Sequence, residues 1–292
     1  MKYKILTILF GVLLATETQA EDINETIDAA AGGLVDISNV AGTIEVYGWS
    51  KGSVEVTGEL GENVEELVLE RDGDRVTVKV KVPKHSSGKI SSEIIVRVPE
   101  GSAIDVSGVS ADIEVEDVLG KQDLHTVSGD VTTKAASADV EAVSVSGDVE
   151  VEGDRKVIET FANTVSGDVT LFGLSGEVKA VAVSGDVTID EGSFDRVAME
   201  SVNGDLFFLA ELVKGGKLGV ETVNGDVEVE LGDNVSAEIE IDSFNGDIEN
   251  CFGPEAQRTS KYAPGWELNF TEGDGEGSVT ISTLNGDIHV CN

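Results

Sequence analysis

The run Val127-Ser128-Gly129-Asp130-Val131 decides the fold of this chain, because copies of it return seven more times downstream. Four copies carry Ser before the Gly, and the last four carry Asn there. The Asp residues of the copies are Asp130, Asp148, Asp168, Asp186, Asp205, Asp226, Asp247 and Asp287. Their spacings are 18, 20, 18, 19, 21, 21 and 40 residues. One repeat is therefore about nineteen residues long, and recurrence at a fixed period is the signature of a stacked repeat fold.

The residues on either side of each copy alternate between apolar and polar. Apolar residues usually stand six and four positions before the Ser or Asn, and three and five after it, as in Leu206 and Phe208. A small Ser, Thr or Ala always stands two positions before it. A period of two is typical of a strand whose polar residues face water. Each repeat is therefore predicted to be two short strands that meet at a Gly corner.

A unit of this size cannot bury its apolar face alone, so the repeats must stack and share one core. We predict an all-β fold, a single-chain parallel β-solenoid in which the repeats are successive windings about 4.8 Å apart. The corner glycines are expected to supply a positive φ. The small residue two positions earlier is expected to point inward, where the chain is crowded.

The chain is predicted to have three parts. Residues 1–20 are typical of a signal peptide, with Lys2 and Lys4 before an apolar stretch and a small-residue cleavage site that ends at Ala20. Residues 21–103 form an N-terminal β section and a first coil, with antiparallel strands and a hairpin at Asp72-Gly73. Residues 104–292 form the solenoid, and an aromatic excursion at 252–277 caps its closing end.

Export follows from the leader, and we expect the mature chain in the periplasm, outside the cell or on its surface. No later run approaches the roughly 18 apolar residues that a membrane span requires, so no transmembrane segment is expected in the mature chain.

The two cysteines stand at the same phase of two repeats. Cys251 and Cys291 each follow the repeat Asp by four positions. Same-phase residues lie about 5 Å apart in neighbouring coils and about 10 Å apart two coils away. A disulfide needs Cα atoms roughly 4.4 to 6.8 Å apart, and export favours its formation. We predict this disulfide, which requires the two coils to be neighbours; a pair of inert free thiols is the alternative.

The charge excludes one class of partner. The 20 Lys and Arg against 56 Asp and Glu give a net charge of −36. A field of this sign repels phosphate, so no nucleic acid is expected as a partner, and an anionic bilayer is disfavoured. Reaction chemistry is sparse, because His85, His125 and His289 share no spacing and no zinc or phosphate-loop pattern occurs. We expect no enzyme and no cofactor, and the oligomeric state stays open.

The eight repeat aspartates are the candidate metal ligands. Carboxylates stacked at about 5 Å repel one another unless each accepts a turn hydrogen bond or they share a cation. Calcium suits such oxygen ligands, but secreted calcium-binding repeats place their ligands far more densely. Capping of the corners is therefore the favoured role, and calcium binding is the alternative.

The repeated Val-Ser-Gly-Asp-Val and Val-Asn-Gly-Asp-Val copies, with the early stretch Gly42 to Trp49 and the closing Asn285-Gly286-Asp287-Ile288, resemble the bacterial putative-adhesin family, a domain of unknown function in exported proteins. The resemblance covers essentially the whole mature chain. It implies a β-solenoid at the cell envelope or outside the cell, with no catalytic residues to carry over.

We therefore expect a non-enzymatic surface protein, a putative adhesin or binding scaffold with a cell-surface or extracellular partner. A polysaccharide-active parallel β-helix enzyme and a structural periplasmic spacer are the alternatives. An enzyme of that type would need Arg, Lys and Asp clustered on one face, whereas the mature arginines are scattered across the phases of the repeat.

Overall fold

The computed structural model describes residues 21–84, 90–135, 138–232, 234–261 and 264–292, so the predicted signal peptide and His85 lie outside the described residues. Every regular element in these ranges is a β-strand, which confirms the all-β prediction. The strands are β1 (Glu21–Asp28), β2 (Leu34–Trp49), β3 (Ser53–Leu60), β4 (Glu66–Asp72), β5 (Arg75–Lys81), β6 (Ser92–Pro99), β7 (Ala103–Glu116), β8 (Gln122–Ser128), β9 (Val131–Ala135), β10 (Val140–Ser146), β11 (Val149–Gly153), β12 (Val157–Ser166), β13 (Val169–Ser184), β14 (Val187–Asn203), β15 (Leu206–Asn224), β16 (Val227–Glu230), β17 (Ala237–Asn245), β18 (Ile248–Asn250), β19 (Gln257–Arg258), β20 (Trp266–Glu272), β21 (Gly277–Asn285) and β22 (Ile288–Cys291).

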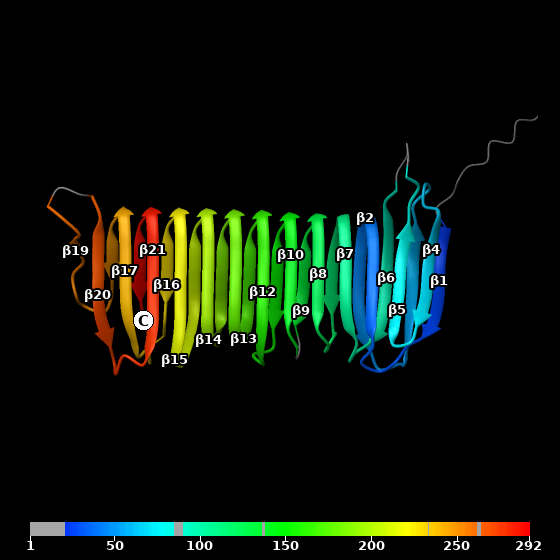
Figure 1. The fold of residues 1–292 in the computed structure, drawn as a ribbon, viewed down its shortest axis with the longest axis horizontal. Helices are drawn as coiled ribbons and strands as arrows, with labels where there is room; N and C mark the ends of the chain where they lie inside the picture. Colours follow the sequence, from blue (N-terminus) through cyan, green and yellow to red (C-terminus); the bar gives the residue numbers. More distant parts are fainter. Residues whose placement is uncertain (1–20, 85–89, 136–137, 233, 262–263) are drawn as a thin grey trace, which may run out of the picture.

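The middle of the molecule, from β7 to β16, is a straight stack in which each repeat of the sequence forms one layer (Figure 1). Successive layers pair in parallel, and residues of equal phase are direct partners. Ser146 of β10 lies between Ser128 of β8 and Ser166 of β12, and Ser166 in turn pairs with Ser184 of β13. Every corner of the repeat therefore lies directly beside the corner of the next layer.

The core runs along the inside of this stack. Inward and outward residues alternate as the period of two predicts: Val149 and Val151 of β11 are buried, and Glu150 between them is exposed. The largest fully buried side chains are Phe194 of β14 and Phe208 of β15, which lie in adjacent layers with ring centroids 6.1 Å apart. A single apolar interior is therefore shared by all layers, as the short repeat requires.

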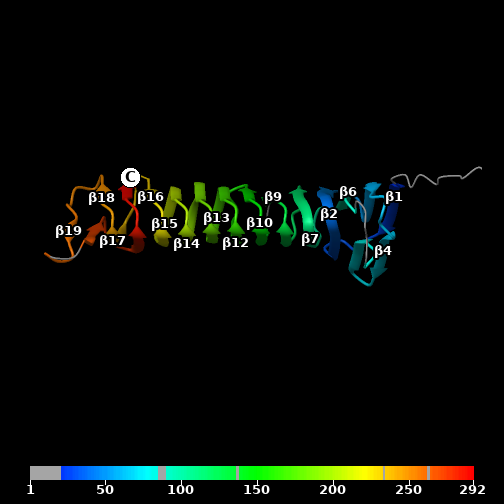
Figure 2. The ribbon, with the colours of Figure 1, turned by 90° about the horizontal axis from the view of Figure 1, so that it is seen from above.

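The opening end of the stack is mixed. Strand β2 pairs in parallel with β7 on one side and with β5 and β6 on the other. Strands β3 and β4 then add antiparallel to β6 and β5, and β1 adds antiparallel to β3. The antiparallel strands predicted within residues 21–103 are thus present for part of the pairings only, because β5 and β6 also pair in parallel with β2 and extend the stack. The predicted hairpin is present, with Asp72 paired to Arg75, and it extends below the stack in Figure 2.

The closing end departs from the order of the sequence. The last repeat, β21 and β22, pairs in parallel with β15 and β16 on one side and with β17 and β18 on the other. In Figure 1 the red β21 accordingly lies between the yellow β15 and the orange β17. The expectation of successive windings is therefore wrong for the last two repeats. The repeat of β17 and β18 forms the outer layer, and the last repeat, β21 and β22, lies between it and the layer of β15 and β16.

Strands β19 and β20, which lie between β18 and β21 in the sequence, cap the stack. Strand β20 adds antiparallel to β17, and β19 pairs antiparallel with β20. Leu268 of β20 is buried, and Phe270 lies against Phe252 with ring centroids 5.5 Å apart. These side chains cover apolar residues of the outermost layer, which would otherwise meet water.

The corner glycines are required for a reason other than the one predicted. Only Gly167, Gly185 and Gly286 of the eight motif glycines, all of them described, have a positive φ, and these values of 155° to 159° are close to extended. A Cβ at any of the eight would lie 1.8 to 2.3 Å from the carbonyl oxygen of the neighbouring layer's corner. The close contact between layers excludes a side chain there, so the prediction of a positive φ is wrong for most of the corners.

Candidate functional site: the corner columns

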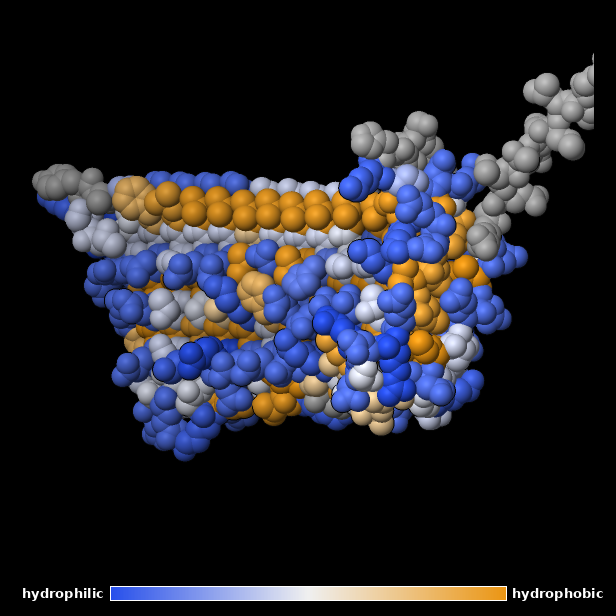
Figure 3. Space-filling model, turned by 45° about the vertical axis from the view of Figure 1, so that its right-hand side comes forward, coloured by the Kyte–Doolittle hydropathy of each residue, from blue (hydrophilic) through white to orange (hydrophobic). Residues whose placement is uncertain are grey.

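An exposed apolar row, here called the corner ridge, runs along one edge of the stack. Each member is the apolar residue that directly precedes the Ser or Asn of the corner, and each is 38% to 50% exposed. In spatial order the members are Val109, Val127, Val145, Val165, Val183, Val202, Val223, Leu284 and Phe244. Figure 3 shows the row as an unbroken orange band along the upper edge. The out-of-order last repeat continues it without a gap.

Sequence reasoning missed the ridge, although a signal was present. The small residue one position earlier points inward, as Thr126 does, so the period of two places Val127 on the outside. An apolar residue at an outward position in all eight copies is the pattern that indicates an exposed row.

Beside the ridge runs an aspartate ladder. From Asp112 to Asp287, the Oδ1 atom of each aspartate accepts a hydrogen bond from the backbone N–H of the aspartate in the next layer, at 2.8 to 3.1 Å, and Asp247 at the end of the ladder only donates. In spatial order the ladder consists of Asp112, Asp130, Asp148, Asp168, Asp186, Asp205, Asp226, Asp287 and Asp247. The carboxylates therefore join neighbouring corners. Capping of the corners and calcium binding by the same residues both stay predictions.

Two further columns tie the layers together. Amide side chains form a ladder in which Asn224 donates to Asn203, Asn285 to Asn224 and Asn245 to Asn285, at 2.8 to 2.9 Å between Nδ2 and Oδ1. An amide both donates and accepts, so such a ladder continues from layer to layer. Inside the corner, hydroxyl groups donate to the carbonyl oxygen of the adjacent layer's corner, as Ser144 does to Gly129 at 2.9 Å. The corner is therefore held by hydrogen bonds on both its outer and its inner side.

At the closing end the ladder borders a hollow of about 350 Å³, here called the acidic groove. Strands β16, β22 and β18 point Glu228, His289 and Glu249 outward side by side, because His289 pairs in register with both glutamates. The residues that line the groove are Asp205, Phe207, Asp226, Val227, Glu228, Asp247, Glu249, Asp287, Ile288 and His289. Its charge favours neutral or cationic groups over anions.

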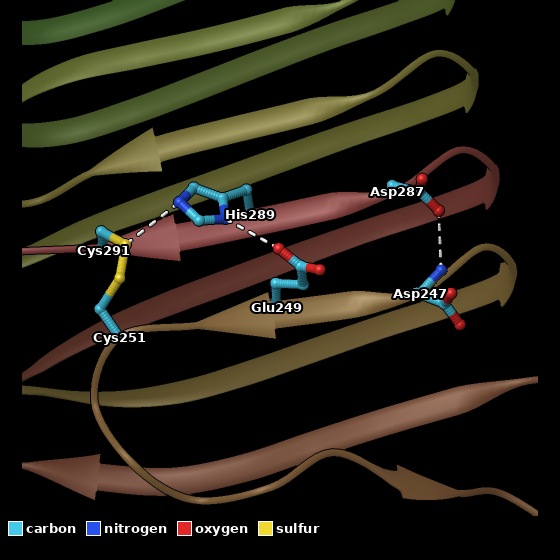
Figure 4. A network of polar contacts seen from close by, with 6 residues as sticks. All are labelled: Asp247, Glu249, Cys251, Asp287, His289 and Cys291. Carbon is cyan, nitrogen blue, oxygen red and sulfur yellow. Dashed lines mark hydrogen bonds and ion pairs between the residues drawn. A yellow bond between two sulfur atoms is a disulfide. The ribbon is translucent and has the colours of Figure 1, made fainter.

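The two cysteines lie beside this groove and form the predicted disulfide, with Cα atoms 4.9 Å apart. The imidazole of His289 lies next to them: Nε2 is 3.2 Å from Sγ of Cys291, and Nδ1 is 3.7 Å from Oε2 of Glu249 (Figure 4). His125, by contrast, stands on β8 far along the stack. Spacing in the sequence could not reveal this cluster, because it depends on which layers are neighbours.

A second hollow, of about 380 Å³, contains the basic side chains of Lys121, Lys179 and Arg196 among acidic residues. Lys121 forms an ion pair with Asp123 at 2.8 Å, and Lys179 one with Glu200 at 2.9 Å. The hydrogen bond to Asp123 raises the pKa of Lys121 above its ordinary value. Lys121 therefore stays protonated and is unsuited to act as a general base near neutral pH.

The family model described as Toastrack DUF4097 matches residues 35–291 of the chain. No curated protein matches it. Within the described residues, no helix has the length and hydrophobicity needed to cross a bilayer.

Three solved structures are similar over most of their length. A putative adhesin from Bacteroides fragilis NCTC 9343 is 11% identical, with a TM-score of 0.48 over 94% of this chain and 98% of its own. A putative adhesin from Parabacteroides distasonis ATCC 8503 is 13% identical, with a TM-score of 0.47 over 94% and 98%. A putative lipid binding protein from the same strain is 14% identical, with a TM-score of 0.45 over 92% and 96%.

Proposed function

This chain belongs to the Toastrack DUF4097 family, and we propose that it is an exported, non-enzymatic β-solenoid protein of the cell envelope or cell surface that binds a partner along its corner face. The observation that carries the proposal is the corner ridge, because it is continuous from Val109 to Phe244 although the order of the last two layers is reversed.

An apolar row of this kind costs free energy when it faces water, and contiguous exposed apolar surface marks interaction sites. With neighbouring strands about 4.8 Å apart, nine side chains in line give a ridge about 38 Å long. The aspartate ladder on one flank fixes the position of every corner. A partner that docks here therefore meets a surface that is already ordered, and little conformational entropy is lost on binding.

The chemistry beside the ridge limits the partner. Hydroxyl and amide side chains follow the ridge, and the carboxylates of the ladder come next. The net charge of −36 opposes any polyanion. The ridge fits an extended neutral or cationic partner with apolar groups at regular intervals.

A non-enzymatic role is supported by the state of the basic residues. Lys121 and Lys179 line the same hollow, and each of them forms an ion pair with an acidic residue. The polysaccharide-active alternative is tested by incubating the mature chain with a panel of polysaccharides and calcium. Release of unsaturated sugars would contradict the proposal.

Binding is tested with a ridge variant and a matched control. The ridge variant carries Val165→Ser, Val183→Ser and Val202→Ser; the control carries Leu119→Ser, Val157→Ser and Phe172→Ser, which are exposed apolar residues away from the ridge. Each is mixed with intact cells, purified cell-wall sacculi and neutral lipid vesicles, and the bound fraction is measured. We expect the native chain and the control to bind one of these, and the ridge variant to bind at least about tenfold more weakly. Equal binding by all three, or no binding to any target, contradicts the proposal.

A further inference from the structure

Three side chains of the kinds that bind transition metals meet at the closing end, away from the corner ridge. Their ligand atoms, Sγ of Cys251, a ring nitrogen of His289 and Sγ of Cys291, all lie within 4.8 Å of one another. We propose that, once the disulfide is reduced, these three residues bind a zinc ion, and that the cross-link between the last two layers then passes through the metal.

The donor set is the one that zinc prefers. Two thiolates and an imidazole are ligands of tetrahedral zinc sites. With zinc–sulfur bonds near 2.3 Å and zinc–nitrogen bonds near 2.0 Å, the sulfur and nitrogen of such a site lie about 3.6 Å apart. Nε2 of His289 is 3.2 Å from Sγ of Cys291, so the imidazole needs a shift of only a few tenths of an ångström. The two sulfurs must move apart to about 3.8 Å once the bond between them is broken. Three protein ligands leave the fourth position to water.

The strand geometry already presents the ligands together. His289 and Cys291 are two positions apart on β22, so their side chains leave the same face of the strand. Cys251 directly follows β18, which pairs with β22, and its backbone N–H donates to the carbonyl oxygen of Val290. The ligands are thus held by the backbone pairing of the two layers and do not depend on the disulfide alone.

Glu249 is placed as a positioning residue for the imidazole. Its Oε2 lies 3.7 Å from Nδ1 of His289, on the side away from the cysteines (Figure 4). A carboxylate beside one ring nitrogen orients the ring and leaves the other nitrogen free for the metal, which is the usual support of a histidine ligand.

Reduction of the disulfide precedes metal binding. A phosphine and one water reduce the disulfide: the sulfur–sulfur bond breaks, the phosphorus becomes a phosphine oxide, and each sulfur gains a proton. In a cell a dithiol supplies the same two electrons and two protons and becomes a disulfide. Zinc then binds both sulfurs as thiolates, and their two protons pass to solvent.

The test uses the full mature chain, oxidised or reduced with a phosphine that is removed before cobalt(II) and then zinc are added. We expect the reduced chain to bind one cobalt ion with the visible and thiolate charge-transfer bands of a tetrahedral site, and zinc to displace it. The oxidised chain shows neither. Glu249→Gln lowers zinc affinity about tenfold, His289→Gln lowers it further, and the matched control His125→Gln leaves it unchanged.

Several results would overturn the proposal. They are the absence of thiolate bands in the reduced chain, equal zinc affinity in His289→Gln and the native chain, and loss of the sheet circular dichroism on reduction, since the ligands would then no longer be held together. The ridge takes no part in this test, so its outcome is independent of the proposed function.

Discussion

The middle of the stack and its closing end are built from the same repeat but assembled differently. From β8 to β16 the layers follow one another in the order of the chain, and the pairing is parallel. At the closing end the last repeat is inserted between two earlier ones, an antiparallel strand covers the outermost layer, and a disulfide joins the two exchanged layers.

The comparison shows that the motif specifies a layer but not its place in the stack. Each copy presents an aspartate that can accept from any neighbouring copy, so Asp287 fits between Asp226 and Asp247 as well as a consecutive repeat would. The corner columns are continuous for this reason. What sets the end apart is strand β20, which pairs with β17 on the edge that the last repeat would occupy if the layers were consecutive. The disulfide joins two layers that are neighbours in either order.

The largest effect is expected from a side chain at a middle corner. In Gly185→Ala the new Cβ would lie 1.8 Å from the carbonyl oxygen of Gly167, so adjacent layers must separate. We expect a loss of about 4 kcal/mol in the free energy of unfolding, measured by denaturant titration. Gly101→Ala is the matched control, because its Cβ meets nothing within 4 Å; a similar loss in both variants would refute the steric explanation.

A comparable but local effect is expected at the closing end. Replacing Cys251 and Cys291 by Ser opens a loop with a sequence separation of 40, for which the loop-entropy stabilisation by a disulfide is about 4 kcal/mol. Hydrogen exchange should speed up in β17, β18, β21 and β22, whereas β8 to β14 keep their protection. Uniform loss of protection along the whole stack would show that the two regions are not distinct.

A stabilising change is expected at the one motif copy whose inward small residue lacks a hydroxyl. Ala182 is buried where Ser144 and Thr164 donate to the carbonyl oxygens of corner glycines. Ala182→Ser supplies the same donor to Gly167 and should raise the free energy of unfolding by about 1 kcal/mol. Thermal and denaturant unfolding measure it, and a destabilisation would mean that this corner lacks room for the hydroxyl.

The smallest expected effect is that of calcium on the unfolding midpoint, and it distinguishes corner capping from calcium binding by the aspartate ladder. Divalent ions screen the repulsion within a chain of net charge −36, so calcium should raise the unfolding midpoint slightly. If the ladder only caps the corners, magnesium at equal ionic strength gives the same rise. A much larger rise with calcium would instead identify the ladder as a calcium site.

Much of this architecture could be predicted from the sequence, because repeat length, alternation and the corner motif act within one layer. The disulfide was also predictable, since Cys251 and Cys291 share a phase. The inserted last repeat was not, because a spacing of 40 residues fits either order of the two layers. The steric requirement for glycine at the corners could not be predicted either. A Cβ there would clash with the carbonyl oxygen of the neighbouring layer, and the sequence of one repeat does not show that contact.

Of the two candidate sites, one could be predicted from the sequence and the other could not. The corner ridge follows from the alternation within each copy and could have been predicted. The cluster of Cys251, His289 and Cys291 exists only because β22 lies beside β18, so no spacing rule could indicate it.

The insertion of the last repeat is tested most directly by cysteine cross-linking of the full chain, with peptide mapping under non-reducing conditions. Glu221 pairs with Ser282 in the structure, whereas Asp242 pairs with Ser282 from the other side. Two layers apart, Glu221 and Asp242 are separated by about 10 Å, which is too far for a disulfide. We therefore predict that Glu221→Cys joins Ser282→Cys and does not join Asp242→Cys. Efficient joining of Glu221→Cys to Asp242→Cys, with none to Ser282→Cys, would contradict the inserted order.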